Sequence, residues 1–253
     1  MEVKKSTVLI TGGGSGIGRS LAHAFIQNGS TVIICGRDER KLEIAKELIP
    51  ELHTKVCDVT NEEQRQALLE WAKEYFPSLN MLINNAGVMH IVDLTQIDAS
   101  DSRVGQEVEI NLVSPIKLSL MFLPLLRAQH QAAVVNISSG FAYVPDAGTP
   151  IYCATKAAIH SFSQSLRYQL RNTDVEVFEV LPPGVDTDLN SEGNFDKLSP
   201  DIVAEVVLKE MTKGTTEIRI GQANPLFYAS RIAPSFIHGV LNSQISKARV
   251  SGK

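Results

Sequence analysis

The chain has 253 residues, 43% of them hydrophobic and 21% charged, with a formal net charge of −4. A chain of this size and composition can bury a large core, and α/β folds often reach this length as a single domain. The slight acidity argues against a nucleic-acid partner, since such proteins usually carry a basic stripe.

The three cysteines are not spaced like metal ligands. Cys35 and Cys57 lie in apolar, strand-like runs, a pattern typical of buried reduced thiols. The first residues lead directly into a strand-like run and lack the apolar segment of a signal peptide, and we find no apolar run as long as a membrane span. We therefore expect a cytoplasmic protein with no metal site and no need of a membrane.

A glycine-rich turn follows the first predicted strand, which covers residues 6–11, and precedes a helical pattern at 19–28. Glycines allow a sharp turn and a close approach to a pyrophosphate, and the start of the next helix offers unpaired N–H groups to that anion. The turn predicts a dinucleotide-binding site formed by Gly12, Ser15, Gly16, Ile17 and Gly18.

The second predicted strand, residues 31–35, indicates which dinucleotide is bound. An acidic residue after this strand would bind the ribose hydroxyls of NAD, whereas an arginine accommodates the 2′-phosphate of NADP. Here Gly36 follows the strand and Arg37 comes next, which favours NADP over NAD. We expect Asp38 to cap the helix predicted at 39–49 rather than to bind the ribose.

Two further predicted strands cover residues 52–57 and 79–84, with a helix at 61–75 between them. Ligands of open α/β sheets bind at the carboxyl ends of the strands. Asp58 follows the first of these strands, and a turn that begins at Asn85 follows the second. Both positions are therefore candidate ligand contacts.

A long helix is predicted at residues 104–129. Asn111 interrupts it and Pro115 and Pro124 lie inside it, so we expect a kink or tolerated prolines. Asn111 lies among apolar neighbours, and a buried amide there needs polar partners.

The fifth predicted strand, residues 132–137, ends at two adjacent serines, and a loop then leads to a helix that begins near Tyr152. Tyr152 and Lys156 are four residues apart and so share one face of that helix. A free tyrosine has a pKa of about 10, which a neighbouring cation lowers toward the range useful for acid–base catalysis. Alone, this spacing fits an ordinary amphipathic helix equally well.

The remaining elements complete an alternation of strands and helices. Residues 175–181 and 217–221 are predicted strands, residues 200–211 form a helix, and the polar residues 190–194 are the candidate lid. This alternation predicts one α/β domain at residues 1–221, built on a doubly wound parallel sheet of seven strands.

Residues 222–253 form a C-terminal extension in which Pro234 starts a helix with an apolar face. The extension could cover a pocket, contact another subunit or lie on a membrane surface. Of these, packing on the domain or on a partner subunit is favoured, because the polar face lacks a dense basic row.

The motifs in their order resemble the short-chain dehydrogenase/reductase family, in its compact single-domain branch. They are Thr11-Gly12-x-x-x-Gly16-Ile17-Gly18, Asp58, Asn85-Ala86-Gly87, Asn111, Ser139, Tyr152-x-x-x-Lys156, Pro183-Gly184 and Thr187. The Cys-Gly-Arg run at 35–37 and residues 153–163 further resemble the DltE-like bacterial oxidoreductases. The resemblance implies a Rossmann-type fold and covers residues 6–221.

The resemblance also implies the catalytic residues Asn111, Ser139, Tyr152 and Lys156. Ser139 is chosen over Ser138 because the family's serine precedes the tyrosine by thirteen residues. Tyr152 would exchange the proton, Ser139 would donate a hydrogen bond, Lys156 would hold the nicotinamide ribose, and Asn111 would anchor a water relay. Further implied cofactor contacts are Asp58, Val59, Asn85, Ala86, Gly87, Pro183, Gly184, Val185 and Thr187.

The implied reaction interconverts a small carbonyl compound and its alcohol with NADP(H), in a homodimer or homotetramer. Ser139, Phe141, Tyr143 and Leu189 are the candidate substrate pocket, whereas His90 is expected to be an exposed loop residue. The alternative is a redox sensor or scaffold that binds the cofactor without turnover. Such a protein need not keep the complete Asn–Ser–Tyr–Lys set, which is present here.

Overall fold

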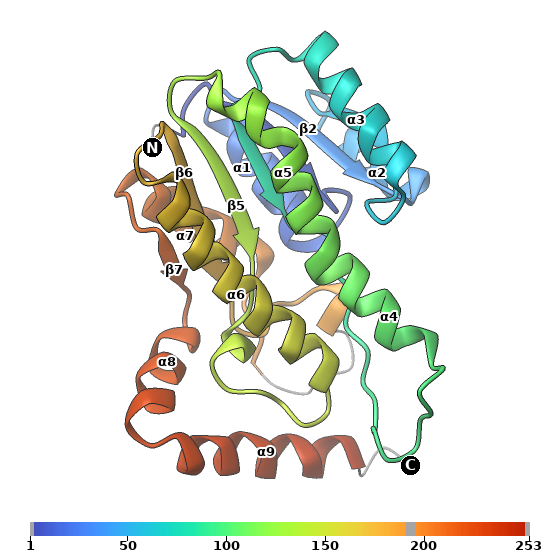
Figure 1. Cartoon of the computed structure of the whole chain (residues 1–253), viewed down its shortest axis with the longest axis vertical. Coiled ribbons are helices and arrows are strands. Elements are labelled where there is room, and N and C mark those ends of the chain that lie inside the picture. The colour runs from blue at the N-terminus through green and yellow to red at the C-terminus, as the bar shows by residue number, and fades with distance from the viewer. Residues whose placement is uncertain (1–2, 191–195, 251–253) are drawn as a thin grey trace.

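A parallel sheet of seven strands forms the centre of the computed structural model, which describes residues 3–190 and 196–250 (Figure 1). The strand order is β3-β2-β1-β4-β5-β6-β7, which confirms the doubly wound α/β fold. The strands are β1 Thr7–Thr11, β2 Thr31–Gly36, β3 His53–Val56, β4 Met81–Asn84, β5 Ala132–Ile137, β6 Val175–Leu181 and β7 Glu217–Arg219.

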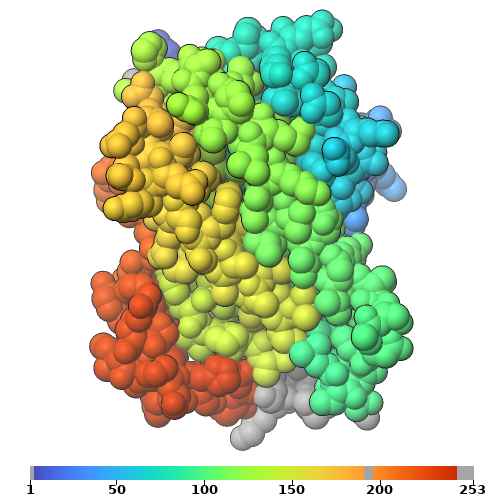
Figure 2. Space-filling view, in the orientation of Figure 1, coloured from blue at the N-terminus to red at the C-terminus, as the bar shows by residue number. Residues whose placement is uncertain are grey.

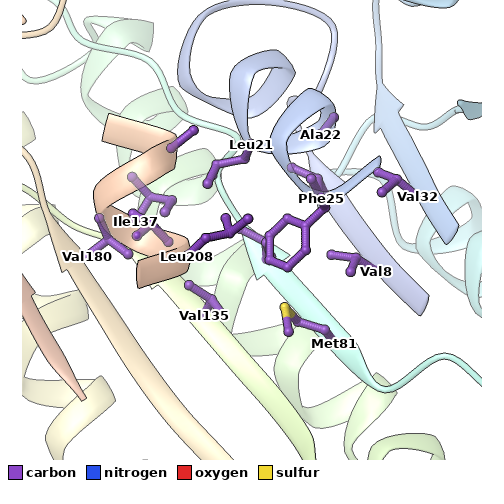
Figure 3. Packing of buried hydrophobic residues seen from close by; sticks show 14 of the residues in the cluster. Val8, Leu21, Ala22, Phe25, Val32, Met81, Val135, Ile137, Val180 and Leu208 are labelled. Carbon is purple, nitrogen blue, oxygen red and sulfur yellow. The ribbon is translucent and has the colours of Figure 1, made fainter. Parts of the chain in front are cut away.

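Helices cover both faces of the sheet. The helices of the described residues are α1 Gly16–Gln27, α2 Glu39–Leu48, α3 Glu62–Tyr75, α4 Ser102–Val108, α5 Ser114–Arg127, α6 Pro150–Leu170, α7 Pro200–Thr212, α8 Ala223–Ile232 and α9 Pro234–Val250. Side chains alternate along a strand, so Val8 and Ile10 pack in one core with α1, α2 and α7, and Leu9 packs in the other with α3, α5 and α6. In the first core, Phe25 lies among Val8, Met81 and Leu208 (Figure 3).

The long helix predicted at 104–129 is interrupted, as expected, near Asn111. A π-helical turn, Glu109–Val113, separates α4 from α5. The whole stretch Ser102–Arg127 is long and apolar enough to span a membrane, which our reading of the sequence did not expect. In this fold, however, Leu118, Phe122 and Leu126 of α5 are buried against the sheet, as in a core helix.

The C-terminal extension forms two helices, and α9 begins at Pro234 as predicted. The helix α8 was not predicted. Figures 1 and 2 show both helices at the end of the molecule where the strands have their carboxyl ends, with α9 beside the loop that precedes α6. The side chain of Asn242 in α9 accepts a hydrogen bond from Ala147 N (2.6 Å) and donates one to Pro145 O (3.2 Å). The extension is thereby fixed to the loop that precedes α6.

Two smaller predictions have clear outcomes. The cysteines, including Cys35 and Cys57, are free and buried, as predicted. The candidate lid at 190–194 lies outside the described residues except for Asn190, which ends a short 3-10 helix, Asp188–Asn190.

Candidate active site

A cavity of about 740 Å³ runs along the carboxyl ends of the strands, from the glycine turn to the C-terminal helices. Most of the predicted cofactor residues line it. They are Gly12, Ser15, Gly16, Ile17, Arg37, Asp58, Val59, Asn85, Ala86, Gly87, Tyr152, Lys156, Pro183, Gly184, Val185 and Thr187. Residues distant in the sequence therefore meet in one continuous site, large enough for an extended ligand.

The glycine turn brings the start of α1 to this cavity. Gly12 and Gly16 have φ values of +63° and +52°, a conformation that other residues rarely adopt. Gly18 does not line the cavity. Instead, it lets α1 pack on the turn, because a Cβ there would lie 2.4 Å from Gly12 O. The N–H groups at the start of α1 consequently face the cavity, as an anion site requires.

The turn after β4 is tied to the glycine turn by Asn85. Its side chain donates to Thr11 O (2.9 Å) and Gly12 O (3.1 Å), and its backbone N–H donates to Thr11 Oγ1 (3.0 Å). These bonds hold the two turns in fixed relative positions, so Asn85 shapes the cofactor site in addition to lining it.

Two cations lie at the β2 end of the cavity. Arg37 was predicted from the sequence, and Lys41 in the first turn of α2 is a second cation that the prediction missed. Lys41 Nζ bonds to Asp188 at 2.9 Å, but both side chains are largely exposed, so this ion pair adds little stability. Asp38 caps α2 by accepting a hydrogen bond from Lys41 N, as predicted.

Ser139 and Tyr152 meet in the middle of the cavity. Both residues are buried, at 8% and 7% exposure. Burial raises the pKa of Tyr152 above its usual value, although its hydrogen bond with Ser139 lowers it in part. This result differs from the prediction that Lys156 brings the tyrosine pKa down. The Lys156 Nζ atom lies 5.3 Å from the centre of the tyrosine ring, and the effect of burial is larger.

The neighbouring serine has a structural role. Ser138 Oγ donates to the backbone oxygen of Lys156 at 3.2 Å, which ties β5 to α6. The two serine hydroxyls thus have different partners, as expected for consecutive residues at a strand end.

Lys156 is 5% exposed, and its Nζ donates to Ile137 O at 2.8 Å. Burial lowers the pKa of this lysine to about 8, against the opposing charges of Glu179 and Glu107. A lysine with this pKa is mostly charged at neutral pH but can still release a proton, which suits acid–base catalysis.

The buried amide of Asn111 finds its partners in the backbone of Val88. It donates to Val88 O (2.7 Å) and accepts from Val88 N (2.9 Å), and so satisfies the requirement inferred from the sequence. Asn111 does not line the cavity. It lies close to it, because a Cβ at Gly87 would be 3.3 Å from Asn111 Oδ1 and 4.0 Å from Lys156 Nζ.

The far end of the cavity was only partly predicted. Of the predicted substrate residues, Ser139, Phe141 and Leu189 line the cavity, whereas Tyr143 does not, and neither does His90. The ring of Tyr143 instead packs edge-on against Phe227, 5.1 Å between ring centres. The lining residues that we missed are Met89, Gln222, Leu226 and Leu241. For Leu226 and Leu241, the signal in the sequence was the apolar pattern of the extension.

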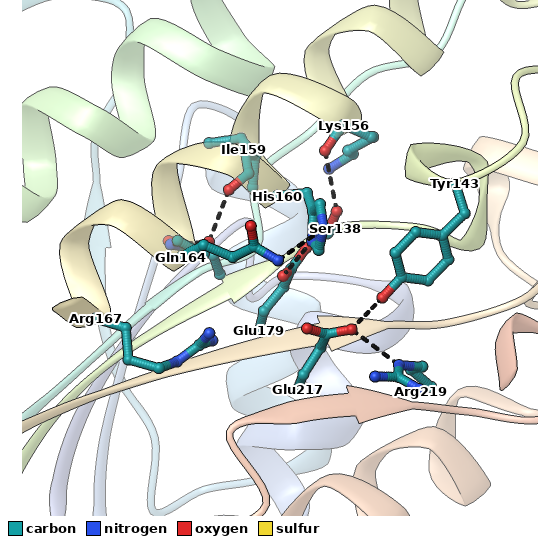
Figure 4. A network of polar contacts seen from close by, with 12 residues as sticks. Ser138, Tyr143, Lys156, Ile159, His160, Gln164, Arg167, Glu179, Glu217 and Arg219 are labelled. Atoms are coloured by element: carbon teal, nitrogen blue, oxygen red, sulfur yellow. Dashed lines mark hydrogen bonds and ion pairs between the residues drawn. The ribbon is translucent and has the colours of Figure 1, made fainter. Parts of the chain in front are cut away.

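Tyr143 belongs to a network of charged groups behind the cavity (Figure 4). Its hydroxyl donates to Glu217, which also accepts from Arg219 Nε at 2.8 Å, and His160 Nδ1 bonds to Glu179 Oε2 at 2.8 Å. Ligand atoms of His160, Glu179 and Glu217 all lie within 4.8 Å of one another, a grouping that the sequence prediction of no metal had not considered. Arg219 already supplies positive charge to Glu217, and His160 already shares a hydrogen bond with Glu179.

Comparison with known proteins gives a consistent result. A family model described as short chain dehydrogenase matches residues 6–197. The uncharacterized oxidoreductase DltE of Bacillus subtilis is 42% identical over 250 residues, which cover 96% of this chain and 99% of that protein. An uncharacterized oxidoreductase of Staphylococcus aureus is 32% identical over 212 residues, 81% of this chain and 90% of that protein.

Solved structures share the fold. A short chain dehydrogenase from Burkholderia cenocepacia in complex with NADP has a TM-score of 0.85 at 23% identity, over 95% of this chain and 99% of that chain. A short chain dehydrogenase/reductase from Burkholderia phymatum in complex with NAD has a TM-score of 0.81 at 24% identity, over 96% and 97% of the two chains.

Proposed function

Because the chain belongs to the short chain dehydrogenase family and is thus an oxidoreductase, we propose that it interconverts a ketone or aldehyde and the corresponding alcohol with NADP(H). The observation that carries the proposal is the hydrogen-bonded pair Ser139 and Tyr152, buried in the middle of the cavity with Lys156 beside it.

A bound nicotinamide would supply or accept the hydride. During reduction, negative charge grows on the carbonyl oxygen of the substrate. Ser139 stabilises that charge by donating a hydrogen bond, and Tyr152 donates the proton. The raised pKa of Tyr152 keeps the phenol protonated at neutral pH, which is the state that a proton donor needs. Alcohol oxidation follows the reverse path, with the phenolate as the base.

Lys156 and Asn111 would restore the proton to Tyr152. Lys156 is buried, has a pKa of about 8, and lies beside the backbone turn that Asn111 holds. We propose that the lysine ammonium binds the nicotinamide ribose and passes a proton to the tyrosine. Asn111 would keep the turn and a connecting water in place.

We further propose that NADP is preferred over NAD. Gly36 stands where NAD enzymes place an acid, and Arg37 and Lys41 both line this end of the cavity. One similar structure holds NADP and another holds NAD, so the fold alone does not decide between them. A charged hydrogen bond is worth about 1.5–3 kcal/mol, so Arg37→Ala should weaken NADPH binding by roughly 10- to 100-fold.

Fluorescence titration with NADPH and NADH tests the cofactor preference. Arg37→Ala should leave NADH affinity nearly unchanged. The control Arg171→Ala removes an arginine at the end of α6, outside the cavity, and should change neither affinity. Tighter binding of NADH than of NADPH by the wild type would contradict the proposal.

The reaction itself is tested by NADPH consumption with a panel of ketones and aldehydes. Tyr152→Phe should lower turnover by about 10²- to 10⁴-fold while NADPH still binds, because only the transferable proton is lost. Undiminished turnover in this variant would refute the mechanism. NADPH binding without turnover across the panel would favour the redox sensor or scaffold.

We also propose a homodimer or homotetramer. Leu120 on α5 and Tyr168 on α6 are 59% and 69% exposed, which fits an interface on the outer faces of these helices. Light scattering measures the assembly, and a monomer at micromolar concentration would contradict it.

A further inference from the structure

The C-terminal helices form one side of the cavity beyond the catalytic residues. Gln222 at the start of α8, Leu226 in α8 and Leu241 in α9 all line it. Phe141, Leu189, Asn190 and Asp196 line the same cavity. Within α8 and α9 themselves, the lining side chains are the two leucines, so the surface that these helices present is apolar.

The position of this wall is fixed relative to the catalytic serine. Gly140 directly follows Ser139, and a Cβ at Gly140 would lie 3.4 Å from Ala223 Cβ and 3.5 Å from Leu226 Cδ1. The two hydrogen bonds of Asn242 hold α9 on the loop before Tyr152. Both helices thus contact the segments that carry the catalytic hydroxyls.

The distribution of charge restricts what can bind there. Among the described lining residues, the cations are Arg37, Lys41 and Lys156 and the acids are Asp38, Asp58, Asp188 and Asp196, and no charged residue comes from α8 or α9. A substrate carboxylate or phosphate placed against these helices would lose its hydration without gaining a countercharge, which is costly. An uncharged apolar group would instead gain free energy by leaving water.

We propose that α8 and α9 form the apolar wall of the substrate pocket, and that the substrates are uncharged ketones or aldehydes that carry an apolar chain or ring. This inference rests on the proposed function, since it names the substrate class of the same site. Leu226 and Leu241 are the specificity-determining residues, because they contact the part of the substrate that does not react.

Calorimetric titration of the NADP⁺-loaded protein with a series of 2-alkanones tests this inference independently of turnover. Each methylene that enters the wall should tighten binding by about fourfold until the cavity is filled. A keto acid of equal length, with a carboxylate in place of the terminal methyl, should bind at least about tenfold more weakly. The same series is then assayed for kcat/KM with NADPH.

In two variants, Leu226→Asn and Leu241→Asn, the affinity for 2-alkanones should rise less with each added methylene than in the wild type. NADP⁺ affinity should not change. Leu48→Asn is the matched control, because this leucine of α2 is 64% exposed and outside the cavity. Unchanged NADP⁺ affinity shows that a variant is folded. If one of the two leucine variants fails to fold, the other still tests the inference.

The outcomes separate the two proposals. Binding that tightens with chain length but is followed by no turnover supports the apolar wall and overturns the proposed reaction. Binding that is independent of chain length, equal binding of the keto acid, or a chain-length dependence unchanged in both variants overturns the apolar wall, whether or not turnover occurs.

Discussion

Gly18 of α1 packs directly on the glycine turn, and Gly18→Ala tests whether this contact holds the cofactor site together. The new Cβ would lie 2.4 Å from Gly12 O and 2.5 Å from Asn85 Nδ2. Comfortable carbon contacts need about 3.5 Å, so the neighbouring atoms must move by roughly 1 Å. The Asn85 amide bridges the two turns, and its displacement breaks its bonds to Thr11 O and Gly12 O.

The expected loss of stability follows from these contacts. Overpacking costs about 1–3 kcal/mol, and each of the two hydrogen bonds contributes about 0.5–1.5 kcal/mol. The free energy of unfolding should therefore fall by about 2–6 kcal/mol, a large part of the 5–15 kcal/mol of a typical domain. NADPH affinity should fall at least about tenfold, because the displaced turn supplies the N–H groups for the pyrophosphate.

Urea unfolding followed by circular dichroism measures the free energy of unfolding of Gly18→Ala. Fluorescence titration measures its affinity for NADPH. The control is Gly105→Ala in α4, where the added Cβ meets nothing within 4 Å. There, the better helix propensity of alanine should raise stability by up to about 1 kcal/mol. A Gly18→Ala protein with wild-type stability and NADPH affinity would refute the reasoning.

Two predictions concern the network behind the cavity. Tyr143→Phe should lower the free energy of unfolding by about 1–2 kcal/mol, because Glu217 loses a donor, and urea unfolding should show no such loss for the exposed control Tyr168→Phe. The hydrogen bond that protonated His160 donates to Glu179, opposed by burial, raises the pKa of His160 above 6.5. The contribution of this pair to the free energy of unfolding is therefore complete below pH 6.5 and is lost as pH rises through the folded-state pKa. Unfolding measured from about pH 6 to 9 should therefore show a steeper loss in the wild type than in His160→Gln, and parallel curves would contradict this.

The sequence predicts the sheet well because the position of a strand is indicated by residues that are neighbours in the chain. Apolar runs mark the central strands, and β5 and β6 begin and end at the predicted residues. The cap Asp38 also acts within three residues of its own position, so local spacing is sufficient to identify it. The cofactor side of the site is predictable for the same reason, since its residues follow the strand ends.

The substrate side depends on contacts between distant segments, which local patterns do not encode. Tyr143 and Leu226 are 83 residues apart, and only the folded extension decides that the leucine lines the cavity while the tyrosine packs on Phe227. The pKa of Tyr152 was misjudged for a similar reason. Its spacing from Lys156 is visible in the sequence, but its burial is a property of the whole fold, and burial has the larger effect.

The π-helical turn Glu109–Val113 makes the chain sensitive to length at this place. A π turn spans five residues per hydrogen bond where an α turn spans four, so it holds one residue more than a regular helix. Removing one residue here would let α4 and α5 join as a continuous α-helix. With α5 fixed in the core, α4 would rotate by about 100°. Glu107, which accepts a hydrogen bond from His90 N, would then face elsewhere. In this family member, we therefore expect substitutions in the turn to be tolerated far better than single-residue deletions.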